Sequence, residues 1–264
     1  VTADMPRLKA LIFDVDGTLA DTEEMHRRAF NLAFAEFDLD WDWTPSLYVD
    51  LLAISGGRER MLAYADRIGK KPKGDFEKLL ATIHRVKTAH YAAMVEDGVL
   101  TLRPGVRRLL KECREQSMPM AIATSSRYSN VDALLRRNLT PNWSTWFEAI
   151  GSCDIIDTKK PSPAVYQYVL DELKVDGTEC VAIEDTVNGN VAAKAANLTT
   201  IITTHYFTRQ KAFPGASLVV NHLGEPDTPF TPSTGNYGDA QYVDLKLLRR
   251  IHAERNSLSA AQAI

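Results

Sequence analysis

Short apolar runs alternate with amphipathic segments over most of this chain. The runs are continuous, often β-branched and bounded by turn residues, which is typical of strands buried on both faces of a parallel sheet. The strands predicted from these runs span 10–13, 120–124, 149–150, 181–183, 200–202 and 218–220. The helices predicted between them span 106–115, 131–137, 163–173 and 189–196. Ser, Asn or Pro stands at or just before these helix starts, and the strand–helix alternation predicts a doubly wound α/β fold.

One long stretch, 22–100, interrupts this alternation because it shows no pattern of a buried strand. The helices predicted there span 22–37, 58–68 and 76–95, separated by the turn Ser55-Gly56-Gly57 and a polar linker at 69–74. We therefore predict an α/β core formed by 1–21 and 101–264, with an all-helical domain inserted at 22–100. The tail is predicted to hold a loop at 224–238 and a short helix at 243–254.

Composition limits the class of function. Of the 264 residues, 45% are hydrophobic and 25% are charged, and the net charge is −3. No basic excess favours nucleic acid or an anionic membrane as a partner, so we expect a small-molecule substrate. The three cysteines, Cys113, Cys153 and Cys180, lack metal-ligand spacing and are predicted to be reduced thiols. We expect a cytoplasmic monomer, or a stromal one if a plastid transit peptide is removed from a longer precursor.

The strongest chemical signal is Asp14-Val15-Asp16-Gly17-Thr18, directly after the first predicted strand. In an extended segment, residues two apart point the same way, so Asp14 and Asp16 both project from the end of the strand where open α/β sheets bind ligands. Neighbouring carboxylates repel each other, and a hard cation such as Mg²⁺ relieves the repulsion. Turn capping is the simpler alternative. A calcium loop would need a further Asp or Asn before the glycine and a helix upstream.

Polar residues also follow the second predicted strand, as Thr124-Ser125-Ser126-Arg127. A hydroxyl at a strand end, together with the backbone N–H groups of the next helix, can donate to phosphoryl oxygens. Lys160 precedes a proline, which favours an extended backbone, and it offers a cation to the same kind of ligand. Taken singly, these residues are explained as well by helix capping and by a solvated lysine.

Two acidic residues, Glu184 and Asp185, end the fourth predicted strand. Acidic side chains at the end of a buried strand are costly unless they are paired or bound to a metal. Together with Asp14 and Asp16 they make an oxygen-rich site that suits Mg²⁺.

In this order, the Asp-Val-Asp-Gly-Thr sequence, the strand-terminal threonine, the Lys-Pro-x-Pro sequence and the Glu-Asp pair resemble the four motifs of the haloacid dehalogenase superfamily. The resemblance covers residues 8–222, and the helical insert lies where that superfamily carries a type 1 cap. It implies a Rossmann-like core and a Mg²⁺-dependent phosphatase that works through an aspartyl-phosphate intermediate.

The resemblance also implies a role for each motif residue. Asp14 would be the nucleophile and Asp16 the general acid and base. Thr124 would bind the phosphoryl group, and Lys160 would neutralise its charge. The implied Mg²⁺ ligands are Asp14, Asp16 through its backbone carbonyl, Glu184 and Asp185.

Within the superfamily the chain resembles the CbbY-like sugar phosphatases, which are relatives of β-phosphoglucomutase. The resemblance rests on T-E-E-x-H-R-x-A-F, G-G-x-E-R, H-R-x-K, L-R-P-G-V and K-K-P-S-P-x-x-Y. It implies xylulose 1,5-bisphosphate, an inhibitory side product of Rubisco in the Calvin cycle, as the substrate and xylulose 5-phosphate as the product. The candidate substrate-binding residues are Glu23, His26, Arg58, Lys87, Ser125, Ser126 and Arg127.

Other functions remain open at this point. A β-phosphoglucomutase-like phosphomutase uses the same pair of aspartates, and a phosphoglycolate phosphatase-like enzyme shares the motifs. A non-catalytic binding protein is also compatible with the fold, because a fold does not fix a function. The complete set Asp14, Asp16, Lys160 and Asp185 favours catalysis, whereas the charged helices of the insert are equally typical of solvated faces.

Overall fold

The computed structural model describes residues 6–54, 56–71, 74–98 and 100–262. Ser55 of the predicted turn and residues 72–73 of the predicted linker lie outside the described residues. The chain divides into two compact units, of which the first, the α/β unit, combines Val1–Asp21 with Thr101–Ile264. The second, the helical unit, is formed by Thr22–Leu100.

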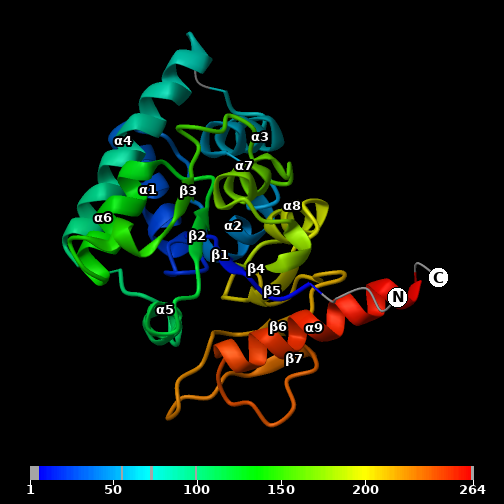
Figure 1. Ribbon diagram of the computed structural model, residues 1–264. Helices are drawn as coiled ribbons and strands as arrows, with labels where there is room; N and C mark the ends of the chain where they lie inside the picture. The colour runs from blue at the N-terminus through cyan, green and yellow to red at the C-terminus, as the bar shows by residue number, and fades with distance from the viewer. Residues whose placement is uncertain (1–5, 55, 72–73, 99, 263–264) are drawn as a thin grey trace. The chain divides into compact units, whose positions relative to one another are not determined.

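A single sheet, ordered β3-β2-β1-β4-β5-β6-β7, forms the centre of the α/β unit (Figure 1). The strands are β1 Ala10–Phe13, β2 Met120–Ala123, β3 Ala149–Gly151, β4 Cys180–Glu184, β5 Thr199–Thr203, β6 Leu218–Val220 and β7 Pro232–Gly235. The pairs from β3 to β6 are parallel, and β7 pairs antiparallel with β6. The doubly wound α/β class is therefore confirmed, and each of the apolar runs that predicted a strand forms one.

The direction in which strands are added reverses at β1. This strand pairs with β2 through Leu11 and Met120, and with β4 through Leu11 and Val181. The chain builds β2 and β3 on one side of β1 and then returns to build β4, β5 and β6 on the other. Open α/β sheets bind their ligands outside the carboxyl ends of the strands at such a switch point. The predicted motif residues follow β1, β2 and β4, so the topology gathers them there.

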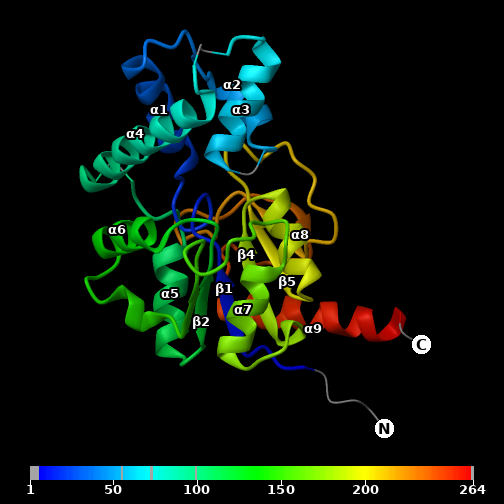
Figure 2. The same cartoon turned by 90° about the horizontal axis from the view of Figure 1, so that it is seen from above.

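Helices cover both faces of the sheet (Figure 2). The helices of this unit are α5 Val106–Glu115, α6 Tyr128–Asn138, α7 Ala164–Leu173, α8 Val187–Ala195 and α9 Leu245–Gln262, with short 3₁₀ turns at Trp143–Trp146 and Gly177–Glu179. Ala10 and Ile12 of β1 pack in one buried cluster with Val165 of α7 and Ala192 of α8. Because side chains alternate along a strand, Leu11 and Phe13 point to the opposite face, where α9 packs against β4 and α5.

The tail differs from the sequence prediction in two ways. The predicted loop at 224–238 contains β7, whose polar Pro-Ser-Thr-Gly sequence has no apolar alternation and forms a strand only by pairing with β6. The terminal helix predicted at 243–254 extends to Gln262 because no Pro or Gly follows to end it. Among the residues that the structure describes, no helix combines the length and the apolar character needed to cross a membrane.

The helical unit has an aromatic core. Its helices are α1 Glu23–Glu36, α2 Pro45–Leu51, α3 Gly57–Ile68 and α4 Phe76–Glu96. Trp43 is fully buried, and its ring lies 4.6 Å from Phe30 and 4.9 Å from Phe34 between ring centroids. The short α2 was not predicted, although its start has ordinary signals: the Thr44 hydroxyl accepts from the Leu47 N–H, and Pro45 occupies the first position.

The cysteines differ in exposure. All three are free thiols; Cys113 and Cys180 are buried, and Cys153 is partly exposed. Burial raises the pKa of the Cys113 and Cys180 thiols to about 12. At pH 8 these two groups are therefore almost entirely in the unreactive thiol form.

We expect a disulfide reagent such as DTNB at pH 8 to modify one thiol in the native protein, Cys153, and all three after denaturation. A thiol with a pKa of about 12 is ionised to roughly one part in 10⁴ at this pH, and burial also blocks the reagent. The absorbance of the released thiolate measures the number of cysteine thiols that have reacted. Cys153→Ser should remove the native reaction, and native modification of Cys113 or Cys180 at a comparable rate would contradict the burial described here.

Candidate active site

Three buried carboxylates meet at the switch point of the sheet. Asp14 follows β1, Glu184 ends β4 and Asp185 comes directly after it. Since Phe13 pairs with Ile183, the residues that follow these two positions lie side by side. Oxygens of the three carboxylates lie within 4.8 Å of one another, and the residues are 6%, 0% and 1% exposed.

Lys160 holds two of these carboxylates. Its Nζ donates to Asp14 Oδ1 at 2.6 Å, to Glu184 Oε1 at 2.5 Å and to the carbonyl of Ala123 at 2.9 Å. Burial alone would lower the pKa of Lys160, but the charges of Asp14 and Glu184 outweigh it and keep the pKa above its ordinary value. The side chain is therefore an ammonium ion throughout the physiological pH range.

The charges of the cluster do not balance. When ionised, Asp14, Glu184 and Asp185 carry three negative charges, of which Lys160 neutralises one. Burial raises the pKa of Asp14 well above its ordinary value, Lys160 opposes that shift, and the charges of Glu184 and Asp185 add to it. A hard cation bound to the carboxylate oxygens removes this excess of negative charge. The donor set is all oxygen and compact, so the residues present fit Mg²⁺.

Glu184 is held by protein donors at both of its oxygens. Tyr166 OH donates to Oε1 at 2.7 Å, and the backbone N–H of Asp185 donates to Oε2 at 3.1 Å. Burial, and then the charges of Glu184 and Asp14, raise the pKa of Tyr166 well above its ordinary value, so the hydroxyl keeps its proton and remains a donor. The carboxylate is thereby fixed beside Lys160.

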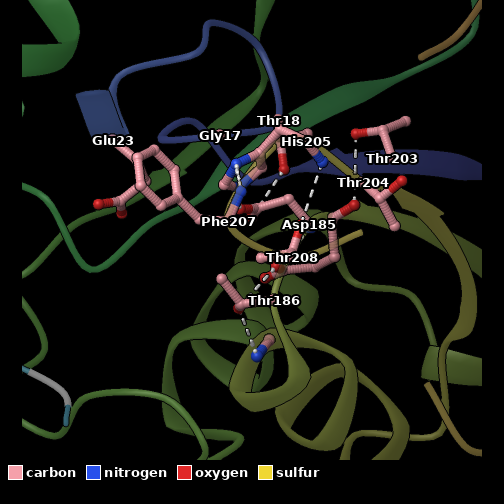
Figure 3. Close-up of polar contacts among 12 residues, drawn as sticks. Gly17, Thr18, Glu23, Asp185, Thr186, Thr203, Thr204, His205, Phe207 and Thr208 are labelled. Atoms are coloured by element: carbon pink, nitrogen blue, oxygen red, sulfur yellow. Dashed lines mark hydrogen bonds and ion pairs between the residues drawn. The ribbon is translucent and has the colours of Figure 1, made fainter. Parts of the chain in front are cut away.

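Asp185 lies between two further donors (Figure 3). The Thr18 hydroxyl donates to Oδ1 at 3.2 Å, and His205 Nε2 lies 2.9 Å from Oδ2. Thr18 comes from the loop after β1, and His205 from the turn after β5. Side chains that follow the two neighbours of β4 thus contact the two oxygens of one carboxylate.

Asp16 lies apart from the cluster, in contact with the loop after β2. It is partly exposed, and its Oδ2 accepts a hydrogen bond from the Ser126 hydroxyl. The backbone N–H of Ser126 in turn donates to Thr124 Oγ1 at 3.1 Å, and Thr124 is only 2% exposed. Ser125 and Arg127, at the start of α6, are exposed. The structure therefore joins Ser126 to Asp16, a contact that the sequence did not indicate.

Arg103 binds backbone carbonyls of the segments that carry Gly17 and His205. Its guanidinium donates to the carbonyl of Gly17, and to those of Thr203 at 3.0 Å, Thr204 at 2.6 Å and Asn221 at 2.6 Å. These carbonyls belong to the loop after β1 and to the ends of β5 and β6. Burial lowers the pKa of Arg103, but an arginine stays charged at such a site. One side chain thus ties together three segments that approach the cluster.

Two of the four candidate residues in the helical unit, the buried Lys87 and the partly exposed His26, contact each other. Lys87 Nζ lies 2.7 Å from His26 Nδ1 and 4.9 Å from the centroid of the Phe30 ring. The His26 ring stacks on Tyr91 with centroids 4.1 Å apart. Lys87 is only 7% exposed, so this cation is part of the interior of the helical unit.

The other two candidates in this unit lie nearer its surface. Glu23 Oε2 accepts from Tyr48 OH at 3.1 Å, and Tyr48 OH accepts from Arg60 Nη1 at 2.9 Å. Arg58 is exposed in the first turn of α3. The structure therefore engages Glu23 in a network and leaves Arg58 accessible.

The sequence analysis did not single out Thr18, Tyr166, Arg103 or His205 as site residues. Tyr166 and Arg103 occur in the sequences K-K-P-S-P-x-x-Y and L-R-P-G-V, which carried the resemblance without a role for these positions. His205 had a usable signal, because it follows an apolar run that forms a strand, as Asp14 and Asp185 do. The partners of these residues are distant along the chain, so only the tertiary structure reveals their contacts.

Comparison with known proteins identifies the class of this chain. The family model of haloacid dehalogenase-like hydrolases matches residues 8–197. The chain is 44% identical to the plasmid-encoded CbbY of Cupriavidus necator over 247 residues, which cover 93% of this chain and 97% of that protein. The chain therefore belongs to the haloacid dehalogenase-like hydrolases. Its similarity to CbbY further makes it an enzyme of the phosphatase type.

Solved structures agree with this assignment. CbbY from Rhodobacter sphaeroides in complex with phosphate superimposes with a TM-score of 0.74 at 40% identity, covering 81% of this chain and 94% of that chain. A variant of the same protein in complex with xylulose 1,5-bisphosphate also gives a TM-score of 0.74, at 39% identity and with 83% and 98% of the two chains covered. A β-phosphoglucomutase from Clostridium difficile shares the fold, with a TM-score of 0.70 at 20% identity over 94% and 98% of the chains.

We predict that Arg103→Lys lowers the free energy of unfolding by about 2–4 kcal/mol, measured by urea denaturation. A lysine ammonium does not reach all of the carbonyls that the guanidinium binds, and a buried acceptor left without a donor costs about 1–3 kcal/mol. The matched control is Arg136→Lys, because Arg136 is exposed and pairs with Asp132 on the same helix. That change should stay within about 0.5 kcal/mol. Equal effects of the two substitutions would refute the idea that Arg103 stabilises the fold through its hydrogen bonds to these carbonyls.

Proposed function

We propose that this chain is a Mg²⁺-dependent phosphatase that converts xylulose 1,5-bisphosphate to xylulose 5-phosphate through an aspartyl-phosphate intermediate. The observation that carries the proposal is the buried carboxylate cluster with Lys160 bound to Asp14. This excess of buried negative charge favours a bound divalent cation, and a carboxylate beside a fixed positive charge suits a nucleophile that attacks phosphorus. The substrate rests on the CbbY relative that binds xylulose 1,5-bisphosphate.

The reaction begins at Asp14. Its carboxylate attacks phosphorus, a bond forms between phosphorus and the aspartyl oxygen, and the bond from phosphorus to the sugar oxygen breaks. Lys160, held by Asp14 and Glu184, neutralises charge on the phosphoryl oxygens. Thr124 and the backbone N–H groups at the start of α6 are proposed to donate to the same oxygens. Bound Mg²⁺ supplies a Lewis acid that further stabilises the charge developing there.

Asp16 handles the protons in both halves of the reaction. It gives a proton to the sugar oxygen that leaves, and then accepts one from the water that attacks the aspartyl phosphate. The second attack breaks the bond between phosphorus and Asp14 and releases inorganic phosphate. We propose that the Ser126 hydroxyl, which donates to Asp16, keeps this carboxylate beside the phosphoryl position.

Asp14, Asp185 and the backbone carbonyl of Asp16 would be the chief ligands that hold the ion. Glu184 contributes its charge, and its two oxygens already accept from Lys160, Tyr166 and the Asp185 N–H. We propose that Glu184 mainly holds Lys160 and that its direct binding to the ion is secondary.

We propose that the helical unit, which is inserted where the superfamily carries a type 1 cap, recognises the second phosphate of the substrate. Arg58, exposed on α3, is the proposed direct contact, with His26 and Glu23 near the start of α1. In the α/β unit Arg127 and Ser125 are exposed at the start of α6 and are proposed to contact the sugar or its distal phosphate. Lys87 is proposed to act indirectly, because its contact with His26 holds that side chain in place in the helical unit.

A screen for phosphate release over sugar mono- and bisphosphates with Mg²⁺ tests the function as a whole. We expect xylulose 1,5-bisphosphate to give the highest kcat/KM among the compounds. Isomerisation of a hexose phosphate that depends on glucose 1,6-bisphosphate would assign the chain to the phosphomutases. A complete lack of turnover on any sugar phosphate would favour the non-catalytic alternative.

Asp14→Asn should lower kcat for phosphate release by at least about 10⁴-fold, because an amide is not a nucleophile. The fold should persist, since Asn has nearly the same shape as Asp. Mass spectrometry of acid-quenched protein should detect one phosphoryl group on the wild type during turnover and none on the variant. Asp171→Asn, at an exposed position on α7, is the control and should retain wild-type kinetics. Normal turnover by Asp14→Asn would rule out the covalent route.

Arg58→Ala should lower kcat/KM for xylulose 1,5-bisphosphate by about 10- to 100-fold and barely change hydrolysis of p-nitrophenyl phosphate, because one charge-assisted contact is worth about 1.5–3 kcal/mol. Arg67→Ala removes an exposed arginine from the other end of α3 and should leave both activities unchanged. Parallel loss of both activities in Arg58→Ala would mean that Arg58 supports the fold. Lys87→Ala is a poorer probe because Lys87 is buried.

A further inference from the structure

His205 is a buried histidine whose two ring nitrogens have different partners. The backbone N–H of Phe207 donates to Nδ1 at 3.4 Å, so Nδ1 is the unprotonated nitrogen. The proton is therefore on Nε2, which lies 2.9 Å from Asp185 Oδ2 and donates to it. The residue is 7% exposed. Its own turn thus fixes the tautomer in which His205 is a donor to a carboxylate of the acidic cluster.

From this geometry we propose that His205 is a positioning residue that holds the carboxylate of Asp185 in the orientation in which it binds Mg²⁺. The proposal rests on the metal site of the proposed function. Thr18 donates to Oδ1 and His205 to Oδ2. Each carboxylate oxygen accepts more than one partner, so a cation can bind an oxygen that already accepts a hydrogen bond. Without the His205 donor the carboxylate could rotate, and binding the ion would have to restrain it.

The backbone that carries His205 is itself restrained. The N–H of His205 donates to Thr208 Oγ1 at 3.1 Å, and the carbonyl of the preceding Thr204 accepts from Arg103. Figure 3 shows this turn, with His205 directed at Asp185 and Thr18 on the same carboxylate. The donor is therefore presented from a fixed segment and not from a mobile loop tip.

The loop after β1 is shaped to admit this pair. Gly17 has a φ of +85°, and a Cβ at this position would lie 2.1 Å from Asp185 Oδ2 and 3.0 Å from His205 Nε2. Only glycine therefore allows the loop that carries Asp14 and Asp16 to pack directly against the hydrogen bond between Asp185 and His205. This close packing places the pair where it can influence the metal and not merely the edge of the sheet.

The test is a comparison of His205→Gln with His205→Met in the full-length protein. The two side chains have similar size, but only Gln can donate to Asp185 from about the position of the histidine Nε2. Binding of MgCl₂ to the metal-free protein is measured by isothermal titration calorimetry without substrate. We expect His205→Met to raise the Kd about 10- to 100-fold, as replacement of such a supporting residue usually does. His205→Gln should stay within about threefold of the wild type.

Controls separate this role from general packing. His252 is buried on α9, and its Nε2 lies 2.7 Å from the Thr178 carbonyl, outside the acidic cluster. His252→Met should lower the thermal midpoint without changing the Kd for Mg²⁺. Asp185→Asn should weaken binding at least as much as His205→Met. A wild-type Kd in His205→Met, or equal weakening in His205→Met and His205→Gln, would overturn the proposal.

Phosphate release from xylulose 1,5-bisphosphate is measured on the same samples, so the two proposals are tested separately. If the Kd follows the expected pattern but the wild type hydrolyses no sugar phosphate, the positioning role stands and the proposed function fails. If the wild type hydrolyses the bisphosphate while His205→Met keeps the wild-type Kd, the positioning role fails alone. A wild type that binds no Mg²⁺ overturns the positioning role together with the metal site.

Discussion

The structure of the site depends on the burial of Lys160 among carboxylates. Removing an ammonium ion and several carboxylates from water is costly, and the attraction between them offsets that cost only when the geometry is good and the remaining polar atoms are bonded. Lys160 meets this condition through Asp14, Glu184 and a backbone carbonyl. The arrangement requires β1 and β4 to be neighbours, because only then do Asp14 and Glu184 reach the same ammonium group.

A second set of contacts surrounds this arrangement. Tyr166 fixes Glu184, Thr18 and His205 fix Asp185, and Ser126 holds Asp16. Behind them Arg103 binds the carbonyls of several strand ends. Polar networks in a low-dielectric interior are stabilising only when nearly every member has its partners. The supporting residues therefore determine how precisely the carboxylates are held, and in our proposal this precision governs both the binding of a cation and the approach of a phosphoryl group.

The two units have different kinds of interior. The α/β unit buries aliphatic strands and ends them with charges, whereas the helical unit buries aromatic rings around Trp43 and a lysine that contacts His26. Chemistry that is common to all phosphate esters belongs to the first unit in our proposal, and the choice of substrate belongs to the second. Such a division lets one catalytic core serve many substrates, since the insert can change without disturbing the buried charges.

The sequence by itself determined which segments form the strands, most helices and the helical insert, and it pointed to Asp14, Glu184 and Asp185, which the structure gathers into a buried cluster. These features are local: buried parallel strands need continuous apolar runs, and the acidic residues placed directly after them appear as short motifs such as Asp-Val-Asp-Gly-Thr. The tertiary structure decided the rest. The polar strand β7 forms only through its pairing with β6. Asp14 and Lys160 are 146 positions apart, and His205 and Thr18 reach Asp185 from opposite sides along the chain. Hydrogen bonds between distant residues depend on which strands become neighbours, and a local sequence pattern does not predict which strands pair.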